Sequence, residues 1–196
     1  GEVAYTDSLI GEFRQALEDR GLLASSLVIL TADHGEGLGD HGEMSHGFFV
    51  YDSTIHVSLI VRPPAGAPGG RVEDSAVSHV DNFPTILDAV DLSAPKRVHG
   101  QSLLPVIAGE NIETLRDVYS ESLYPLLHYG WAPLRAIRTD KRKLISAPRP
   151  ELFDVVADPR EESDLSLEQP GLTTELEERL ADLREKIESD APAAGA

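Results

Sequence analysis

The fold of this chain is constrained most by a short aliphatic segment. An acidic side chain and an imidazole side chain follow it almost directly. Residues 27–30 read Leu-Val-Ile-Leu, which is typical of a buried strand, and the apolar spacing over residues 5–20 predicts an amphipathic helix before it. A helix followed by a buried apolar strand favours a parallel α/β sheet. Ligands bind at the carboxyl ends of strands in such sheets, and Asp33 and His34 follow this strand.

The loop that follows, residues 31–47, interleaves glycines with acidic and histidine side chains. Gly35 allows Asp33 and His34 to turn toward one point, and their oxygen and nitrogen atoms suit a divalent cation. An isolated Asp-His pair is more often a turn former. Four of the seven histidines fall within the 23 residues from His34 to His56, and this density leaves a metal site and an ordinary loop about equally favoured.

The same loop contains a G-x-G-x-x-G pattern at residues 37–42. A dinucleotide site needs such a loop to open a helix whose amides face the pyrophosphate. Asp40 would stand where the phosphate charge belongs, and no helical pattern follows. A dinucleotide site is therefore not expected.

Composition excludes several classes of function. The 196 residues include 17 Lys and Arg against 34 Asp and Glu, a formal charge of −17 that argues against a nucleic-acid partner. The chain contains no cysteine, which excludes disulfides, thiolate metal sites and a cysteine nucleophile within it. No stretch of 18 apolar residues is present, so no membrane span is expected.

Downstream patterns predict a change of architecture near residue 115. Residues 57–61 predict a strand, and residues 83–90 and 102–107 predict helices. Further strands are expected at 118–122, 134–138, 143–146 and 151–156, with a turn at 139–142 and a helix at 174–189 that opens on a Thr174…Glu177 capping box. We expect a core portion at residues 1–115, a small antiparallel subdomain at 116–190 and a frayed tail at 191–196.

Several separate blocks, in order and at suitable spacing, resemble the sulfatases of the alkaline-phosphatase-like superfamily. The blocks are residues 31–36 (Thr-Ala-Asp-His-Gly-Glu), 39–43 (Gly-Asp-His-Gly-Glu), 46–47 (His-Gly), 80–87 (Val-Asp-Asn-Phe-Pro-Thr-Ile-Leu), 99–105 (His-Gly-Gln-Ser-Leu-Leu-Pro), 136–139 (Ala-Ile-Arg-Thr) and 151–154 (Glu-Leu-Phe-Asp). The resemblance implies the C-terminal part of an alkaline-phosphatase-like α/β core, followed by a small antiparallel α+β subdomain.

The resemblance also assigns roles to residues of the loop. Asp33 and His34 look like half of a divalent-metal site, with calcium the first choice and magnesium, manganese or zinc as alternatives. His46, 13 positions after Asp33, matches a residue that contacts sulfate or phosphate oxygens. A loop histidine bonded to backbone is its plainer interpretation. Loop ordering or support of the ligands is expected of Glu36, Asp40, His41 and Glu43.

The resemblance places the nucleophile and two acidic metal ligands upstream of such a segment. The Ser-Ala-Pro-Lys-Arg sequence at 93–97 matches the bare nucleophile pattern, but it lies downstream of Asp33 and is expected to be a linker. No catalytic residue is therefore assigned here, and we expect this chain to be a C-terminal fragment that is inactive in isolation.

Three functions remain open from the sequence. The first is a sulfuric ester hydrolase that acts on a small-molecule or saccharide sulfate ester. The second is a phosphodiesterase or phosphoethanolamine-type transferase of the same superfamily, which the Asp33-His34 pair with a downstream His46 would suit equally. The third is a binding module without catalysis.

Overall fold

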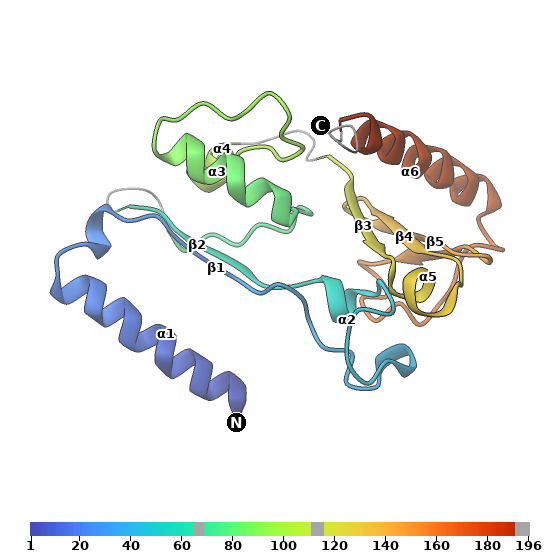
Figure 1. The fold of residues 1–196 in the computed structure, drawn as a ribbon, viewed down its shortest axis with the longest axis horizontal. Coiled ribbons are helices and arrows are strands. Elements are labelled where there is room, and N and C mark those ends of the chain that lie inside the picture. The colour runs from blue at the N-terminus through green and yellow to red at the C-terminus, as the bar shows by residue number, and fades with distance from the viewer. Residues whose placement is uncertain (65–68, 111–115, 191–196) are drawn as a thin grey trace.

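The computed structural model describes residues 1–64, 69–110 and 116–190, and it divides its strands between two antiparallel sheets (Figure 1). A two-stranded sheet lies in the N-terminal half, and a four-stranded sheet lies in the C-terminal half. The expected tail, residues 191–196, lies outside the described residues.

The N-terminal segment runs from helix α1 (Glu2–Asp19) through the 3-10 turn η1 (Leu23–Ser25) into β1 (Val28–Thr31). Gly21 adopts a positive φ of 67° directly after the helix, a conformation that glycine tolerates without strain. The helix begins three residues before the predicted start. None of its side chains is buried, although its apolar spacing predicted a packed face.

Strand β1 pairs with β2 (Leu59–Arg62) in antiparallel register, from Val28 opposite Arg62 to Thr31 opposite Leu59. The expectation of a parallel sheet is wrong for this pair, because a short apolar run carries no information on strand direction. Both strands are half-buried rather than fully buried. Between them lie the 3-10 turn η2 (Asp40–Gly42) and the short helix α2 (Asp52–Ile55).

After β2, the chain forms the 3-10 turn η3 (His79–Asp81) and the helices α3 (Asn82–Ala89) and α4 (Leu104–Ala108). The buried Asp81 carboxylate joins these pieces, because it accepts hydrogen bonds from the Ser78 and Gln101 amides at 2.8 and 2.9 Å and pairs with Arg116. The two predicted helices are present, each shifted by one or two residues.

The four-stranded sheet follows in the order β3 (Val118–Ser122), β4 (Leu134–Arg138), β5 (Arg142–Ser146) and β6 (Glu151–Asp154), with all neighbours antiparallel. Helix α5 (Tyr124–Tyr129) connects β3 to β4. Helix α6 (Pro170–Asp190) ends the described chain and begins four residues before the predicted start. The Thr174 capping box is therefore wrong, since Pro170 occupies the first turn, where a missing amide costs nothing.

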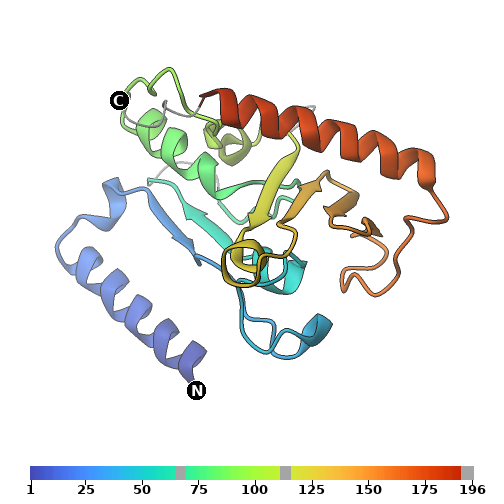
Figure 2. The same cartoon turned by 45° about the vertical axis from the view of Figure 1, so that its right-hand side comes forward.

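Two apolar clusters occupy opposite faces of this sheet, as the alternation of side chains along a strand requires. On one face Ile137, Leu144 and Leu152 pack against Leu176 and Leu180 of α6. Figure 2 shows α6 lying along this face. The opposite face packs against the segment that precedes α2, with a cluster formed by Val50, Ala136, Ile145, Phe153 and Val155.

Among the described helices, none combines the length and the apolar character needed to cross a membrane. The division into units at 1–115 and 116–190 stays a prediction.

Candidate functional site

The segment directly after β1 carries the first two predicted site residues, Asp33 and His34, on the surface. Their side chains are 89% and 44% exposed, which leaves both accessible to a ligand. Asp33 Oδ1 accepts a hydrogen bond from the His34 amide at 3.0 Å, and this bond lowers the pKa of the Asp33 carboxyl. Asp33 is therefore a carboxylate at neutral pH.

A hydrogen bond to the backbone orients the His34 ring. Nδ1 lies 2.9 Å from the carbonyl oxygen of Gly35, and because a carbonyl only accepts, Nδ1 carries the hydrogen. Nε2 then keeps its lone pair, and it lies 3.6 Å from Asp33 Oδ2. One carboxylate oxygen and one imidazole nitrogen thus point to the same place, with the donor chemistry that a divalent cation requires.

Gly35 is required at the turn that positions this pair. Its amide donates to the Thr54 carbonyl oxygen at 2.7 Å, and a Cβ added at Gly35 would lie only 2.4 Å from the backbone oxygen of Ser53. Any larger residue would push the loop away from α2. The glycine that the sequence placed behind Asp33 and His34 is therefore explained by close backbone approach.

The third predicted residue, His46, comes back to lie on His34. The two rings stack with centroids 3.8 Å apart and an interplanar angle of 29°. The intervening loop closes through the Gly37 amide, which donates to the Ser45 carbonyl oxygen at 2.8 Å. A Cβ added at Gly37 would lie only 2.4 Å from the backbone carbonyl oxygen of Glu43, so this closure also depends on a glycine.

Glu36 orients the His46 ring. Its Oε2 lies 3.1 Å from His46 Nδ1, and because a carboxylate only accepts, Nδ1 donates this bond. Nε2 of His46 has no hydrogen-bond partner within the described part of the chain. The ring therefore presents one nitrogen outward, beside the Asp33–His34 pair.

The neighbouring charged residues of the loop make contacts that order it. The buried Glu43 carboxylate accepts hydrogen bonds from the amides of Phe48 and Phe49 at 2.7 and 3.2 Å. The His41 ring stacks on Tyr51 with centroids 3.6 Å apart, and its Nε2 lies 3.0 Å from the Arg160 carbonyl oxygen. These contacts fit the loop-ordering interpretation. A surface hollow of about 380 Å³ lies beside them, lined by residues 39–41 and 160–162, and it includes none of the three site residues.

Within residues 1–64, 69–110 and 116–190, no three His, Asp or Glu side chains gather as a set that could hold a metal ion. Asp33 and His34 offer two donor atoms of the predicted kind, and His46, stacked on His34, places a third polar side chain beside them without adding a carboxylate. The described residues alone therefore do not form a complete metal site.

A buried ionic cluster, which the sequence did not predict, anchors the segment after the loop. The fully buried Lys143 Nζ lies 2.8 Å from Asp52 Oδ1 and 2.7 Å from Glu161 Oε1. Arg138 pairs with the other Asp52 oxygen, and the Asp52 amide donates to Glu161 Oε2 at 2.6 Å. The first residue of α2 is therefore fixed to the four-stranded sheet and to the loop after β6.

The pKa values of the two carboxyl groups in this cluster, Asp52 and Glu161, shift in opposite directions. Burial acts to raise the pKa of Asp52, but the charges of Lys143 and Arg138 outweigh it and hold the pKa below its usual value. For Glu161, burial dominates and raises the pKa despite the attraction of Lys143. Lys143 and Arg138 thus favour the ionised form of Asp52, whereas burial opposes ionisation of Glu161.

Comparisons with known proteins identify the relatives of this chain. A family model described as "N-sulphoglucosamine sulphohydrolase, C-terminal" matches residues 39–186. Arylsulfatase K of Bos taurus is 31% identical over 193 residues, which cover 90% of this chain and 34% of the relative. The chain thus spans about a third of the length of that relative.

Solved structures share the fold over nearly the whole chain. BT4656, described in complex with its substrate D-glucosamine-2-N,6-O-disulfate, is 28% identical with a TM-score of 0.79, over 99% of this chain and 41% of that one. A phosphonate monoester hydrolase of Agrobacterium radiobacter is also 28% identical with a TM-score of 0.80, over 94% of this chain and 40% of that one. These likenesses confirm the expected α/β class and the expected resemblance.

Proposed function

Because the chain belongs to the family of sulfatase C-terminal segments described as N-sulphoglucosamine sulphohydrolase, C-terminal, we propose that it forms the C-terminal part of a metal-dependent hydrolase of sulfate esters. The activity belongs to the longer protein, since this chain spans about a third of its arylsulfatase relative. The observation that carries the proposal is the convergence of Asp33, His34 and His46 at the end of β1.

Asp33 and His34 would hold the divalent cation, through Asp33 Oδ2 and His34 Nε2. Calcium is the first candidate because carboxylate oxygen is its preferred ligand, and magnesium, manganese and zinc compete with it. The remaining ligands would come from the sequence before residue 1, since two ligands do not complete a site. When bound, the cation neutralises negative charge on the oxygens of the ester being cleaved.

The residues of this chain hold and orient the charged group of the substrate. Because Nδ1 already donates to Glu36, His46 Nε2 would donate to a sulfate oxygen in the imidazolium form, in which both ring nitrogens carry a hydrogen. That cation would stabilise negative charge as it builds on the sulfate oxygens. Glu36, bonded to Nδ1, fixes the ring in the orientation that this contact needs. The Gly35 carbonyl does the same for His34, so both rings are positioned before substrate binds.

We propose a sulfated saccharide as the substrate class. The support is the similarity to BT4656, whose substrate is a disulfated glucosamine, together with the match to an N-sulphoglucosamine sulphohydrolase family. The similar fold of a phosphonate monoester hydrolase keeps phosphorus esters as the alternative to be tested beside it.

The test is the Asp33→Asn substitution in the full-length protein. We expect bound divalent metal, measured by mass spectrometry, and turnover of sulfate esters to fall together, because Asn keeps the shape of Asp33 but not its charge. Asp40→Asn is the matched control, an exposed carboxylate of the same loop that contacts Arg160 instead. Unchanged metal content in the Asp33→Asn protein would contradict the assignment.

Parallel assays with sulfate and phosphate esters separate the two chemistries. Preferential turnover of the phosphate ester by the unmodified protein would favour the phosphodiesterase alternative.

A further inference from the structure

An exposed cluster of aromatic rings, which the proposed function leaves unused, adjoins the His46 loop. We call it the aromatic patch, and it consists of Phe48, Tyr124, His128, Tyr129 and Trp131. Tyr124, Tyr129 and Trp131 are 43%, 55% and 58% exposed, respectively. Aromatic groups gathered on a surface indicate a binding site more often than single exposed apolar residues do.

Local backbone geometry assembles the patch. Gly130 follows helix α5 with a φ of 67° that reverses the chain, and the Trp131 amide donates back to the Pro125 carbonyl oxygen at 3.2 Å. This reversal brings the Trp131 ring to 5.1 Å from Tyr129 and to 5.8 Å from Phe48, in an edge-on contact with the latter. Tyr124 and His128, one turn apart, stack with centroids 4.1 Å apart.

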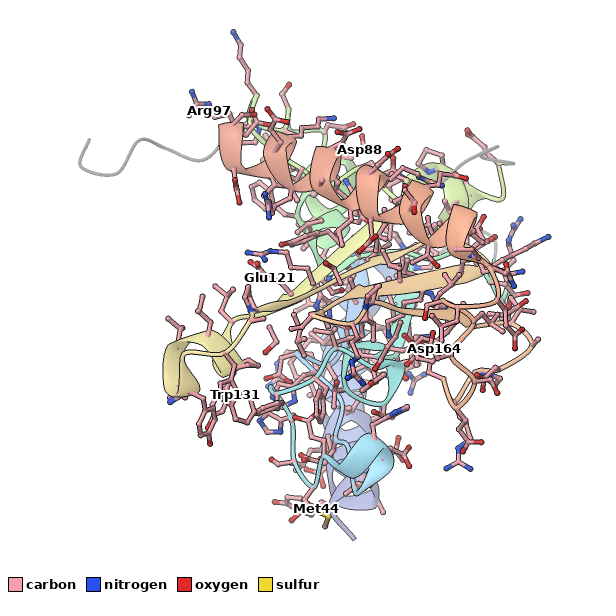
Figure 3. All side chains as sticks on the ribbon, turned by 90° about the vertical axis from the view of Figure 1, so that its right-hand side faces the viewer. Met44, Asp88, Arg97, Glu121, Trp131 and Asp164 are labelled. Atoms are coloured by element: carbon pink, nitrogen blue, oxygen red, sulfur yellow. The ribbon has the colours of Figure 1, made fainter. Side chains whose placement is uncertain are left out.

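The patch is continuous with the candidate anion site. Phe48 stands two residues after His46, and the Gly47 carbonyl between them accepts a hydrogen bond of 2.5 Å from Ser122, at the end of the strand that leads into α5. Figure 3 shows Trp131 on the side of the four-stranded sheet opposite to α6, the side on which the loop with Met44 at its tip also lies. A molecule whose sulfate meets His46 would therefore extend over Phe48 toward α5.

The chemistry of the patch fits a sugar ring. One face of a pyranose presents polarised C–H bonds, which are attracted to the negative face of an aromatic ring, while its hydroxyls need polar partners. Tyrosine, tryptophan and histidine offer both a ring face and a polar tip. None of the five members is acidic, although the chain contains 34 Asp and Glu, so the patch does not repel an anionic substrate.

We propose that the aromatic patch is the subsite for the saccharide ring of the sulfated substrate, with Trp131 and Tyr129 as its principal contacts. This proposal rests on the proposed function, because it places the sulfate at His46. It adds that substrate selectivity lies partly on α5 and the turn after it.

The experiment compares Trp131→Ala with Trp131→Phe in the full-length protein, acting on a sulfated glucosamine disaccharide. We expect Trp131→Ala to raise KM about tenfold, the effect of losing one well-packed aromatic contact, with kcat within about twofold. Trp131→Phe should restore most of the loss because it keeps a ring. The Ki of inorganic sulfate should stay unchanged, since sulfate alone meets only the anion site.

Leu127→Ala is the matched control, because Leu127 is a 75% exposed apolar side chain on α5, the helix before Trp131, and is not part of the patch. It should leave KM unchanged. Equal KM values for Trp131→Ala and the unmodified protein, with hydrolysis intact, would overturn the subsite while leaving the proposed function standing. A large fall in Tm of Trp131→Ala without a rise in KM would show that another part of the protein, or a second copy, covers the patch, which also overturns it.

Failure of the proposed function would look different, since the unmodified protein would then not hydrolyse the disaccharide. Calorimetric titration with the unsulfated disaccharide still tests the patch in that case. Binding that is weakened about tenfold by Trp131→Ala and restored by Trp131→Phe supports a saccharide subsite, and absence of binding overturns it.

Discussion

At the scale of single residues, Lys143 shows how one side chain ties distant parts of the chain together. Its neighbours on the sheet face include Arg138 on β4, which lies opposite it in the register, and Phe153 on β6. A buried ammonium group is tolerated only when it is paired, and Asp52 and Glu161 supply the pairing charges. Lys143 therefore holds α2, and with it the end of the His46 loop, against the sheet.

We predict that Lys143→Met destabilises the protein by about 3 kcal/mol, because it leaves two buried carboxylates facing each other with Arg138 as their remaining cation. Urea unfolding at neutral pH measures the loss. Lys141→Met is the control, since Lys141 lies exposed in the turn between β4 and β5. Equal stability of the two variants would show that the cluster contributes little.

The pH dependence of stability should reveal Asp52. Its folded pKa lies below the unfolded value of about 3.9, so its ionised form contributes stability that is complete above about pH 5 and is lost as the pH falls through the folded pKa. We expect the advantage of the unmodified protein over Asp52→Asn to shrink between about pH 5 and pH 3. Asp140→Asn, in an exposed turn, should show no such advantage at any pH.

The residues of the site differ in how far sequence alone could place them. The adjacency of Asp33 and His34 after a strand is visible in the sequence, and the family resemblance supplied the position of His46. The ionic cluster could not be predicted, because Asp52 meets Lys143 across 91 residues and Glu161 across 109. The aromatic patch depends on the chain reversal at Gly130, which hydrophobic periodicity does not detect.

At the scale of elements, the two sheets show that the sequence pattern predicts where a strand lies but not the direction in which it pairs. The predicted bounds of β3 and β4 agree with the structure, because each strand has a β-rich sequence with polar or turn residues at its ends. The direction of β1 relative to β2 was predicted wrongly, since pairing depends on the path of the intervening 27 residues and not on the strands themselves. The predicted start of α6 was wrong because it rested on a Thr174…Glu177 capping box, whereas the helix begins at Pro170, a residue that the first turn accepts.

Helix α6 should be held mainly by two leucines. Leu176→Ala, at a side chain that is 1% exposed against Leu144 and Leu152, is predicted to cost about 3 kcal/mol through the cavity it leaves. Thermal unfolding followed by circular dichroism measures this loss. Leu167→Ala, at a side chain that is 92% exposed, should leave the stability within about 0.5 kcal/mol. Similar losses at both positions would contradict the packing of α6 on the sheet.

At the scale of the whole molecule, the chain gathers one side of a site around the end of β1. Asp33, His34 and His46 converge there, but within the described residues no three such side chains gather as a set that could hold a metal ion. The four-stranded sheet and α6 form a core of their own. Helix α6 lies on the face of the sheet opposite to the segment that precedes α2 (Figure 2). This arrangement is what the proposed function requires of one part of a larger active site.

We predict that residues 1–196 expressed alone do not hydrolyse aryl sulfates or aryl phosphates, with calcium, magnesium, manganese or zinc added. Two ligands hold a cation weakly, and the resemblance places the nucleophile outside this segment. The full-length protein, assayed beside it, is the positive control. Metal-dependent turnover by the segment that disappears on Asp33→Ala would show that these residues suffice.

The outward-facing apolar side chains of α1 have a consequence for how this segment behaves in water. Val3, Tyr5 and Phe13 are 85%, 66% and 62% exposed, so the helix is held by its own backbone hydrogen bonds and by little else. An 18-residue helix in that state opens and closes readily. Its amide protons should exchange with deuterium at nearly the rate of a free peptide, while those of β4 and β5 remain protected for far longer.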